Sequence, residues 1–557
     1  MSEQTTSVLA GIGQITLLVA LLAACQVPLG NLLFVTATSE KDFWFERWIY
    51  KVVGIDPRKQ QNWRHCLFAV LGFSVAGLLL LYLVLRVQAV LPLSLGHAGF
   101  APDGAFNTAI SFVTNTNWQW YSPEAAIGHT AQMIGLTVQN FVSGATGIAV
   151  AFVLVRGFAR QRTDQLGNFW VDLVRVSLRV LLPMAVVVAL LLVLGGAIQN
   201  LAGPTIIDAL NGGQQSIPGG PTASQEAIKQ LGTNGGGFFN ANAAHPFENP
   251  NPATNILSIW AMTVIPFALP YTVGRMIGDR RQGVAITITM AVLWLAGVAA
   301  ITMAELSAAG AAPQLAGGAM EGKEMRFGEW GSALFAASST GTSTGAVNSM
   351  HDSLTAAGGG TAMLLMMLNE VSPGGVGTGT YGILCFAILT VFVGGLMVGR
   401  TPEYLGKKIG RTEITAVSIA VLAMPFALLI GTAISISTQS GQTSLTNEGY
   451  HGFSEMLYGY TSAANNNGSA FAGLNANTPL LNIGQGLAML TGRFVTIAAI
   501  MALAGSLSRQ HKVPASAGTL PTHGPLFVVM LLGIIIIVAG LTFLPALALG
   551  PIAEALL

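Results

Sequence analysis

Charged side chains are scarce in this chain: they make up 9% of its 557 residues, whereas hydrophobic residues make up 52%. A water-soluble globular protein carries far more charge, so this composition excludes that class and indicates a polytopic membrane protein. The net charge of +1 leaves no dense basic face that would compete for phosphates. We therefore expect membrane lipid as a partner and no nucleic acid.

Cysteine is also rare. Cys25, Cys66 and Cys385 lie in or beside apolar segments without CxxC spacing, which indicates neither a disulfide framework nor a thiolate metal site. A cleavable signal peptide is not expected either. The first apolar run has acidic Glu3 and no basic residue before it, and it is long enough to span a membrane.

Motifs for nucleotide chemistry are missing from the sequence. There is no GxxxxGK[ST] phosphate loop, because Gly406-Lys407-Lys408 is followed by Ile409. There is also no Asp-Lys-Thr-Gly stretch of the kind that a P-type ATPase phosphorylates. We therefore expect a non-catalytic chain that binds no nucleotide, so any active transport would need a second subunit for ATP hydrolysis.

Apolar runs of about 20 residues, each long enough to cross a membrane as a helix, dominate what is present. They lie near residues 8–34, 67–90, 130–155, 173–194, 254–275, 284–306, 361–397, 414–436, 480–507 and 526–548. The sequence therefore predicts an all-α polytopic membrane protein with about ten transmembrane helices.

Basic residues are concentrated in alternate loops and the span ends beside them. Lysine and arginine accumulate on the cytoplasmic side of a membrane, so these loops are expected to be cytoplasmic and both termini extracytoplasmic. The basic residues are Lys41, Arg47, Lys51, Arg58, Lys59, Arg64, Arg156, Arg160, Arg162, Arg175, Arg179, Arg275, Arg280, Arg281, Arg400, Lys407, Lys408, Arg411, Arg509 and Lys512.

Four of the opposite loops contain a short, moderately apolar segment followed by a cluster of Gly, Asn, Thr or Ser. The clusters are Thr114 to Gln119, Gly232 to Gly237, Thr342 to Ala346 and Asn465 to Ser469. They recur about 110 to 120 residues apart, and such a near-regular interval indicates an internal repeat. Ordinary Gly/Asn turns are the alternative for any one loop. Polar backbone at membrane depth must be buried or line a cavity, so four such loops favour a shared central axis.

Each unit is predicted to contain a span, a short re-entrant helix, a polar loop and a second span. Four units would surround a pseudo-fourfold pore, with one extra helix at each end of the chain. The predicted division is 1–66, first transmembrane helix and cytoplasmic loop; 67–165, repeat 1; 166–283, repeat 2; 284–411, repeat 3 with a broken second span; 412–512, repeat 4; and 513–557, final transmembrane helix.

The four clusters lack carboxylates, which a divalent-cation site would be expected to supply. Rings of backbone carbonyls from four loops replace the hydration shell of potassium in channels. Glycine and asparagine tolerate the left-handed backbone conformations that aim such carbonyls. The neutral lining therefore favours a large, weakly hydrated monovalent cation.

Three long blocks carry a resemblance to a known family: Phe112 to Gln119, Leu231 to Asn240 and Gly399 to Lys408. Over essentially its whole length the chain resembles the potassium-binding A subunit of the Kdp potassium-transporting ATPase, in the superfamily of potassium transporters. The resemblance implies a complex in the bacterial cytoplasmic (inner) membrane. In it this subunit would select potassium, a P-type ATPase B subunit would hydrolyse ATP, and a C subunit and a small F subunit would complete the assembly.

The resemblance also implies which residues form the potassium-binding selectivity filter. They are Asn115, Thr116 and Asn117; Thr233, Asn234 and Gly235; Ser343, Thr344 and Gly345; and Asn466, Asn467 and Gly468. Thr344 stands where some relatives carry cysteine, so the resemblance implies a role there for the backbone. Trp118 and Gln119 are expected to support the first loop, although Trp118 is equally compatible with an interfacial anchor.

The seventh apolar run is interrupted at Ser372 to Gly379, where a proline and several glycines disfavour a helix. A kink is the plain interpretation. The functional interpretation is a gate below the filter that involves Gly374, Gly375 and Gly377.

Two charged residues inside the spans need partners or water. Arg493 lies near the middle of the ninth span, where a charge is costly, so either Glu370 or the free carbonyls of the broken span should pair with it. Snorkelling to the interface is the alternative. Glu370 precedes the break and is expected either along the ion pathway or in a structural salt bridge.

Three functions remain open from the sequence. The leading one is the potassium-selecting and translocating subunit of an ATP-driven high-affinity uptake complex, which passes potassium to a P-type ATPase subunit. A self-sufficient potassium channel or ion-coupled transporter of the same repeat architecture is the second. A structural subunit with a vestigial pore is the third.

Overall fold

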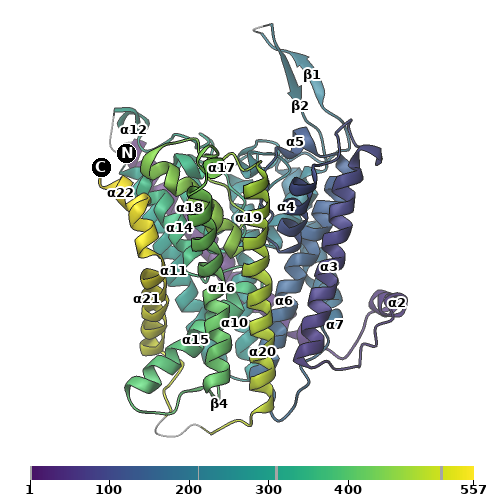
Figure 1. Ribbon diagram of the computed structural model, residues 1–557, viewed down its shortest axis with the longest axis vertical. Helices are drawn as coiled ribbons and strands as arrows, with labels where there is room; N and C mark the ends of the chain where they lie inside the picture. The colour runs from purple at the N-terminus through teal and green to yellow at the C-terminus, as the bar shows by residue number, and fades with distance from the viewer. Residues whose placement is uncertain (1–2, 211, 308–310, 515–518) are drawn as a thin grey trace.

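The computed structural model describes residues 3–210, 212–307, 311–514 and 519–557. Within these ranges, ten helices are long and apolar enough to cross a membrane, and they pack into one bundle (Figure 1). The spans are Ser7–Thr38, Trp63–Val90, Ala131–Ala159, Phe169–Leu194, Pro252–Ile277, Arg280–Leu306, Thr378–Met397, Arg411–Ile436, Pro479–Arg509 and Pro525–Leu549. The prediction of an all-α polytopic membrane protein is confirmed.

Shorter elements connect and interrupt these spans. In chain order the elements are α1 Glu3–Thr38, α2 Trp44–Val53, α3 Trp63–Val87, η1 Gln88–Val90, α4 Pro102–Val113, α5 Pro123–Ala126, η2 Ala131–Thr137, α6 Val138–Ala159, α7 Phe169–Val176, η3 Ser177–Leu181, α8 Leu182–Leu194, β1 Thr205–Asp208, β2 Gln214–Ile217, α9 Thr222–Leu231, η4 Asn242–Ala244, α10 Pro252–Ile277, α11 Arg280–Leu306, α12 Ala311–Ala316, α13 Gly328–Gly341, η5 His351–Ser353, α14 Ala356–Met367, α15 Thr378–Met397, β3 Glu403–Tyr404, β4 Lys407–Lys408, α16 Arg411–Ile436, α17 Gln439–Gln442, α18 Gly449–Asn465, α19 Pro479–Leu490, η6 Thr491–Val495, α20 Thr496–Arg509, α21 Pro525–Leu549 and α22 Pro551–Ala555.

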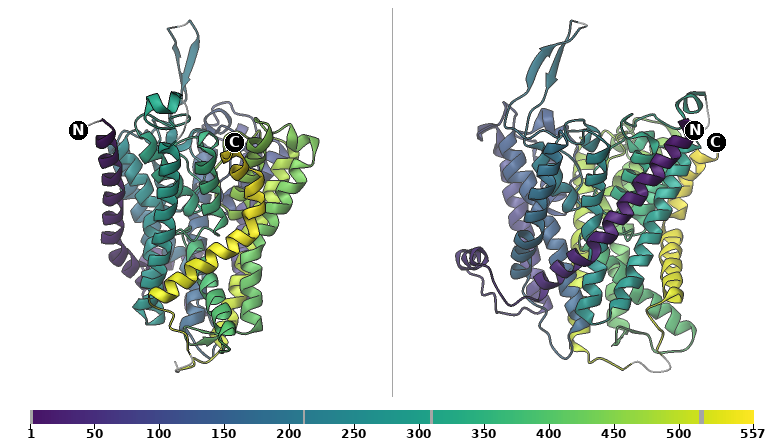
Figure 2. Two further views of the ribbon diagram at one scale, coloured as in Figure 1. Left: turned by 90° about the vertical axis from the view of Figure 1, so that its left-hand side faces the viewer. Right: turned by 180° about the vertical axis from the view of Figure 1, so that it is seen from behind.

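Four helices are too short to span and lie between pairs of spans: α4, α9, α13 and α18. Each stands between the two long helices of one predicted repeat, for example α4 between α3 and α6. Helices α1 and α21 run obliquely across the outside of the bundle (Figure 2), where the sequence predicts one extra helix at each end.

Some helices begin earlier than the predicted repeat boundaries. Helices α3, α11 and α16 start at Trp63, Arg280 and Arg411, so the boundaries at 67, 284 and 412 fall inside them. Polar caps explain the difference: the side chain of Asn62 accepts a hydrogen bond from the His65 N–H, and Asp279 caps α11 in the same way. These first turns are too polar to count as apolar runs.

The seventh apolar run forms two helices. Helix α14 ends at Met367 and α15 begins at Thr378, so residues 368–377 interrupt the run where its proline and glycines predict a break. The expected run of 361–397 is therefore not one span, and only α15 is long enough to be counted as one.

Two small antiparallel hairpins were not anticipated by the all-α prediction. Strands β1 and β2 project beyond the helices (Figure 1), and β3 pairs with β4 at the opposite end. The second hairpin turns at Leu405 and Gly406, whose φ values are +54° and +75°. Two consecutive left-handed residues are the geometry of a tight two-residue hairpin turn.

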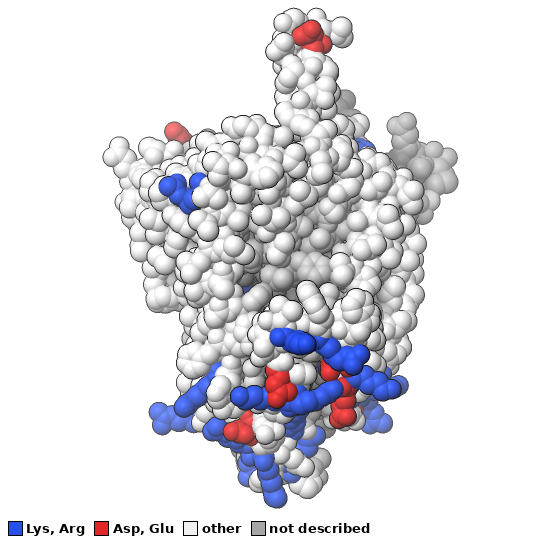
Figure 3. Space-filling model, turned by 90° about the vertical axis from the view of Figure 1, so that its right-hand side faces the viewer, with Lys and Arg blue, Asp and Glu red and all other residues white. Residues whose placement is uncertain are grey.

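Charge is distributed unequally between the two ends of the bundle. Lysine and arginine gather at the end opposite the β1–β2 hairpin (Figure 3), whereas both termini lie at the hairpin end (Figure 1). This distribution agrees with the expected orientation, in which the basic end faces the cytoplasm. The assignment of the two ends to the two sides of the membrane stays a prediction.

The short C-terminal helix α22 is tied to the half-helix α18 through His451. Its Nε2 lies 2.9 Å from Asp352 Oδ1 and its Nδ1 lies 2.8 Å from Glu554 Oε1. The hydrogen bond to Asp352, together with Glu554, raises the pKa of His451 from 6.5 to about 9. The stabilising contribution of the imidazolium is therefore fully present below pH 6.5 and is lost as the pH rises through about 9.

We expect the substitution His451→Asn to lower the melting temperature of the purified protein at about pH 6 by a few degrees. The difference from the wild type should shrink to nearly nothing at about pH 10, because the neutral imidazole no longer bridges two carboxylates. Thermal unfolding in detergent across this range measures it, with the exposed His511→Asn as control. A difference that stays constant with pH would contradict the ion-pair explanation.

Candidate functional site

The four half-helices α4, α9, α13 and α18 end at the four predicted polar loops, inside the protein. The middle residues of these loops are fully buried: Thr116, Asn234, Thr344 and Asn467 are each 0% exposed. A helix C-terminus carries a partial negative charge from its unpaired carbonyls. Four such ends directed at loops that meet one another create a site that favours a cation.

All four loops share one backbone geometry. At the first residue of each predicted filter triplet the chain is left-handed, with φ of +67° at Asn115, +47° at Thr233, +54° at Ser343 and +59° at Asn466. The next N–H then donates to the carbonyl five residues back in the half-helix. These bonds are Thr116 to Ser111 (2.9 Å), Asn234 to Lys229 (3.0 Å), Thr344 to Ser339 (3.1 Å) and Asn467 to Ser462 (2.9 Å).

This left-handed residue with a six-to-one hydrogen bond is the Schellman ending of a helix. It usually employs glycine, because a left-handed residue with a side chain costs about 1–2 kcal/mol. None of the four residues here is glycine. Asparagine tolerates this conformation, so the backbone strain falls mainly on Thr233 and Ser343. The same left-handed turn at four equivalent positions fixes the direction of the peptide groups, and strained residues of this kind are typical of functional sites.

Glycine is required where the loops approach one another. A Cβ on Gly235 would overlap the carbonyl oxygen of Thr116 and lie 2.8 Å from that of Asn467. A Cβ on Gly468 would overlap the same Thr116 oxygen, and one on Gly345 would overlap the Asn467 oxygen. Backbone from all four loops therefore meets at one place, with carbonyl oxygens among the converging atoms.

Side-chain amides hold the first two loops together from outside this meeting point. The Asn115 amide donates to the Thr233 carbonyl at 2.7 Å, and its oxygen accepts from the Ser143 hydroxyl at 2.7 Å. The Asn234 amide donates to the Asn140 carbonyl at 3.1 Å. Asn140 and Ser143 on α6 were missed by the sequence analysis, although they are polar residues in an apolar run.

The two predicted support residues, Gln119 and Trp118, contact the loops in different ways. Gln119 clamps the second loop, since its Oε1 accepts from the Gly237 N–H at 3.0 Å and its Nε2 donates to the Gly237 carbonyl at 3.3 Å. Trp118 is 2% exposed and its carbonyl accepts from the Ser111 hydroxyl at 2.9 Å. Its side chain therefore packs inside the protein, which rules out the interfacial anchor.

Buried charges fix the second half-helix. Lys229 is 0% exposed and its ammonium contacts Glu226 and, at 2.5 Å, Glu248. The other Glu248 oxygen accepts from the Phe239 N–H at 3.3 Å. The three side chains form a buried network, in which the ammonium and the two carboxylates satisfy one another in the interior.

Side chains around the third and fourth loops include Glu370. The Asn467 amide donates to Glu370 Oε1 at 2.9 Å and to the Ser339 carbonyl at 3.1 Å.

The first and third loops share a pair of threonine hydroxyls. The Thr344 hydroxyl lies 2.6 Å from that of Thr342, as the Thr116 hydroxyl lies 2.8 Å from that of Thr114 in the first loop. Thr344 therefore directs its hydroxyl to its own helix end.

The interruption between α14 and α15 passes directly below the loops. The Gly374 N–H donates to the Gly341 carbonyl at 2.7 Å, and the Val376 N–H donates to the Thr233 hydroxyl at 3.0 Å. A Cβ on Gly377 would overlap the Gly147 carbonyl of α6. The segment thus reaches from the third loop past the second to the first repeat.

Arg493 differs from one sequence expectation. It is 4% exposed, so it does not snorkel, and its guanidinium donates to the Ser143 carbonyl at 3.2 Å. Among the described residues it forms no ion pair with Glu370. The expected pair is replaced because Asn467 engages the carboxylate, while a carbonyl of α6 accepts from the arginine.

A cavity of about 60 Å³ is lined by both Glu370 and Arg493 and lies beside the loops. Filter residues Ser343 and Asn466 form part of its wall. Ala420 and Met424 of α16 form another part. The cavity therefore extends from the loops toward the α16 side of the bundle.

Comparisons with known proteins place these features in a family. The family profile described as the potassium-transporting ATPase A subunit matches residues 16–556. A protein of Clavibacter sepedonicus named potassium-transporting ATPase potassium-binding subunit is 57% identical over 98% of this chain and 99% of its own length. A protein of the same name from Streptomyces coelicolor is 57% identical over 99% of both chains.

A solved structure shares the fold at low sequence identity. The potassium transporter TrkH from Vibrio parahaemolyticus superposes with a TM-score of 0.55 at 13% identity, over 89% of this chain and 98% of its own. The resemblance inferred from the three sequence blocks is confirmed by the family profile and the relatives. The chain belongs to the family of potassium-transporting ATPase A subunits.

Proposed function

We propose that this chain is the potassium-selecting and translocating subunit of an ATP-driven potassium uptake complex. The observation that carries the proposal is the left-handed helix ending repeated at Asn115, Thr233, Ser343 and Asn466, with backbone from all four loops meeting at one place. The names of its relatives, potassium-binding subunits of a potassium-transporting ATPase, support potassium as the cargo.

The carbonyl-rich loops supply the chemistry of selection. Backbone oxygens substitute for the water shell of a potassium ion when several of them surround it at once. The proposed filter comprises Asn115, Thr116, Asn117, Thr233, Asn234, Gly235, Ser343, Thr344, Gly345, Asn466, Asn467 and Gly468. In it the backbone faces the ion, while the side chains of Asn115 and Asn234 hold neighbouring segments.

The segment below the loops is proposed to block the straight path across the membrane. Gly374, Gly375 and Gly377 let it pack against the second loop and α6, and Arg493 adds a positive charge beneath the filter. The cavity lined by Glu370 and Arg493 would then receive the ion and direct it sideways past α16. In this scheme a P-type ATPase B subunit takes the ion, and C and F subunits complete a complex in the bacterial inner membrane with extracytoplasmic termini.

Ion uptake by this chain with and without its ATPase partner tests the proposal against a self-sufficient channel or ion-coupled transporter. We expect potassium accumulation only when both are present in a strain that lacks other potassium uptake, because the segment at 368–377 closes the direct path. Rubidium uptake by the same cells provides the rate. Uptake by the chain alone at the rate of the pair would establish the channel or transporter instead.

A further inference from the structure

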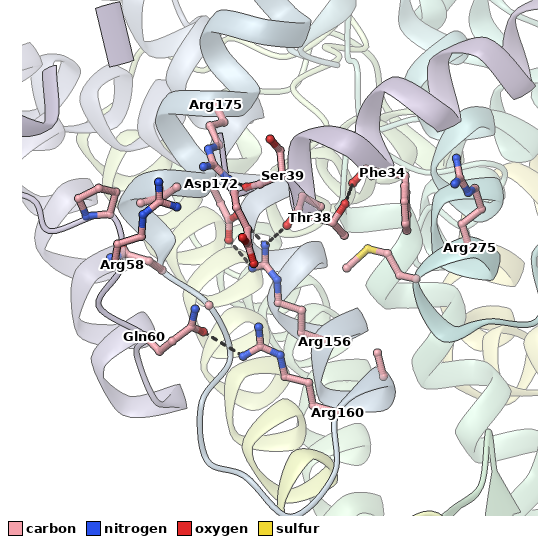
Figure 4. Close-up of a pocket in the computed structure, with 18 residues that line it drawn as sticks. Phe34, Thr38, Ser39, Arg58, Gln60, Arg156, Arg160, Asp172, Arg175 and Arg275 are labelled. Atoms are coloured by element: carbon pink, nitrogen blue, oxygen red, sulfur yellow. Dashed lines mark hydrogen bonds and ion pairs between the residues drawn. The ribbon is translucent and has the colours of Figure 1, made fainter. Parts of the chain in front are cut away.

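A cavity of about 740 Å³ lies at the basic end of the bundle, far from the four loops. The C-terminal ends of α1, α6 and α10 and the start of α7 border it (Figure 4). Arginines line it from α6 and the residue after it, from α7, from α10 and from the connection after α2. They are Arg58, Arg156, Arg160, Arg175 and Arg275.

Only part of this positive charge is neutralised. Both carboxylate oxygens of Asp172 accept hydrogen bonds from Arg156, at 2.5 and 2.7 Å. Asp42 forms ion pairs with Arg175 at 2.7 Å and with Arg58 at 2.9 Å. Exposed Glu40 is the remaining acid of the lining, so the arginines outnumber the carboxylates around the cavity.

Two of the arginines have no carboxylate partner among the described residues. Arg160 donates to the Gln60 side chain at 3.0 Å and to the Gln165 carbonyl at 2.8 Å. Arg275 donates to the Asn31 side chain and lies 3.9 Å above the Phe34 ring. Each guanidinium has five N–H donors, so both retain donors for a ligand.

The electrostatics of the cavity also favour an anion. Burial and the nearby charge of Arg156 lower the pKa of Arg160. The buried Nε of Arg175 has no hydrogen-bond partner in the described part of the chain, although the same side chain binds Ser39 and Asp42 through its other nitrogens. An anion in the cavity would reduce the repulsion between the arginines and provide acceptors for these donors.

A second, apolar cavity of about 500 Å³ is lined by α2 and by the chain that follows α7, where Leu178 comes three residues after Arg175. It is lined by Trp44, Phe45, Trp48, Ile49, Leu178 and Leu182. Helix α2, which contributes the aromatic residues, projects sideways from the bundle near its basic end (Figure 1), and Trp44 and Trp48 are 75% and 64% exposed. Tryptophans on a short helix at the end of the spans are typical of a segment that lies in the lipid headgroup region.

We propose that the arginine cavity binds a phosphate group, supplied by the headgroup of an anionic phospholipid or by free phosphate. Guanidinium groups bind phosphate oxygens in pairs, and basic pockets between membrane helices are known lipid-headgroup sites. The cavity is much larger than one phosphate, and the adjacent apolar cavity would accommodate part of an acyl chain.

Lipid binding to the full-length chain, purified with any subunits that remain attached, tests the proposal. Native mass spectrometry after delipidation would follow titration with phosphatidylglycerol, with neutral phosphatidylcholine, and with inorganic phosphate. The test variant is Arg160→Gln with Arg275→Gln, which leaves both arginine–aspartate networks intact. The matched control is Arg281→Gln, an exposed arginine at the same end outside the cavity.

We expect the wild type and the Arg281→Gln control to bind phosphatidylglycerol in preference to phosphatidylcholine. The double variant should bind it about 30-fold more weakly, since two arginine contacts are lost. Binding of inorganic phosphate that shows the same dependence on Arg160 and Arg275 would identify the free anion as the ligand. Equal affinity of the wild type and the double variant for both anionic probes would overturn the proposal.

Discussion

Replacement of Gly235 by aspartate should weaken apparent potassium affinity by about 10-fold or more and change the discrimination against sodium and ammonium. Any Cβ at this position overlaps the Thr116 carbonyl oxygen and crowds that of Asn467, so the meeting point of the loops must shift. Insertion of atoms into closely packed structure costs about 1–3 kcal/mol, enough for the expected loss of affinity. The carboxylate also adds a charge to an otherwise neutral lining, which favours smaller cations.

Matched variants separate the two effects. Gly235→Ala adds the Cβ without the charge, so it should lose affinity and change ion discrimination less than the aspartate does. Gly533→Ala in α21 places its Cβ more than 4 Å from the other described residues and should leave transport unchanged. Concentration dependence of rubidium uptake by the complex, with sodium and ammonium as competitors, measures all three. An unchanged affinity in Gly235→Asp would favour the vestigial pore, with ions entering through the partner.

The fold was largely predictable because its signals are local. Apolar runs long enough to span predict the helices, and the glycines and proline at 372–379 predict the interruption between α14 and α15. Polar first turns such as Trp63-Arg64-His65 hide the true helix starts, because such turns lower the local hydropathy. The exposed β1–β2 hairpin lacks a buried face that would have produced an alternating pattern.

The site was predictable in its loops but not in its contacts. The glycine and asparagine clusters mark where the backbone must turn, and a resemblance assigns them to a filter. The partners come from segments far away in the chain: Ser143 of α6 accepts from Arg493, and Asn467 holds Glu370. Several polar groups compete for each such buried donor, and only packing of the spans decides among them. The sequence therefore offered Glu370 or the carbonyls of the broken span as partners of Arg493, whereas the acceptor in the structure is the Ser143 carbonyl of α6.

Deletion of Gly374 to Gly377 should convert the complex into a passive pathway for potassium. These residues carry the chain across the space below the loops, from the Gly341 carbonyl to the Gly147 carbonyl of α6. Without them only residues 368–373 connect α14 to α15, and the hydrogen bond from the Val376 N–H to the Thr233 hydroxyl is lost. We expect the passive flux in proteoliposomes without ATP to rise about 10-fold or more, which needs a barrier only about 1.4 kcal/mol lower.

Two point variants test the same gate in case the deletion variant does not fold. Thr233→Val removes the hydroxyl that accepts from the Val376 N–H, whereas Thr233→Ser keeps it. If the segment is a gate, the valine variant leaks more than the serine variant, because only the valine variant releases the segment while both keep the loop backbone. Size-exclusion chromatography shows whether the deletion variant is folded. If it is folded, and if its passive flux and that of the valine variant equal the flux of the wild type, the segment is a structural kink. The barrier to potassium then lies elsewhere.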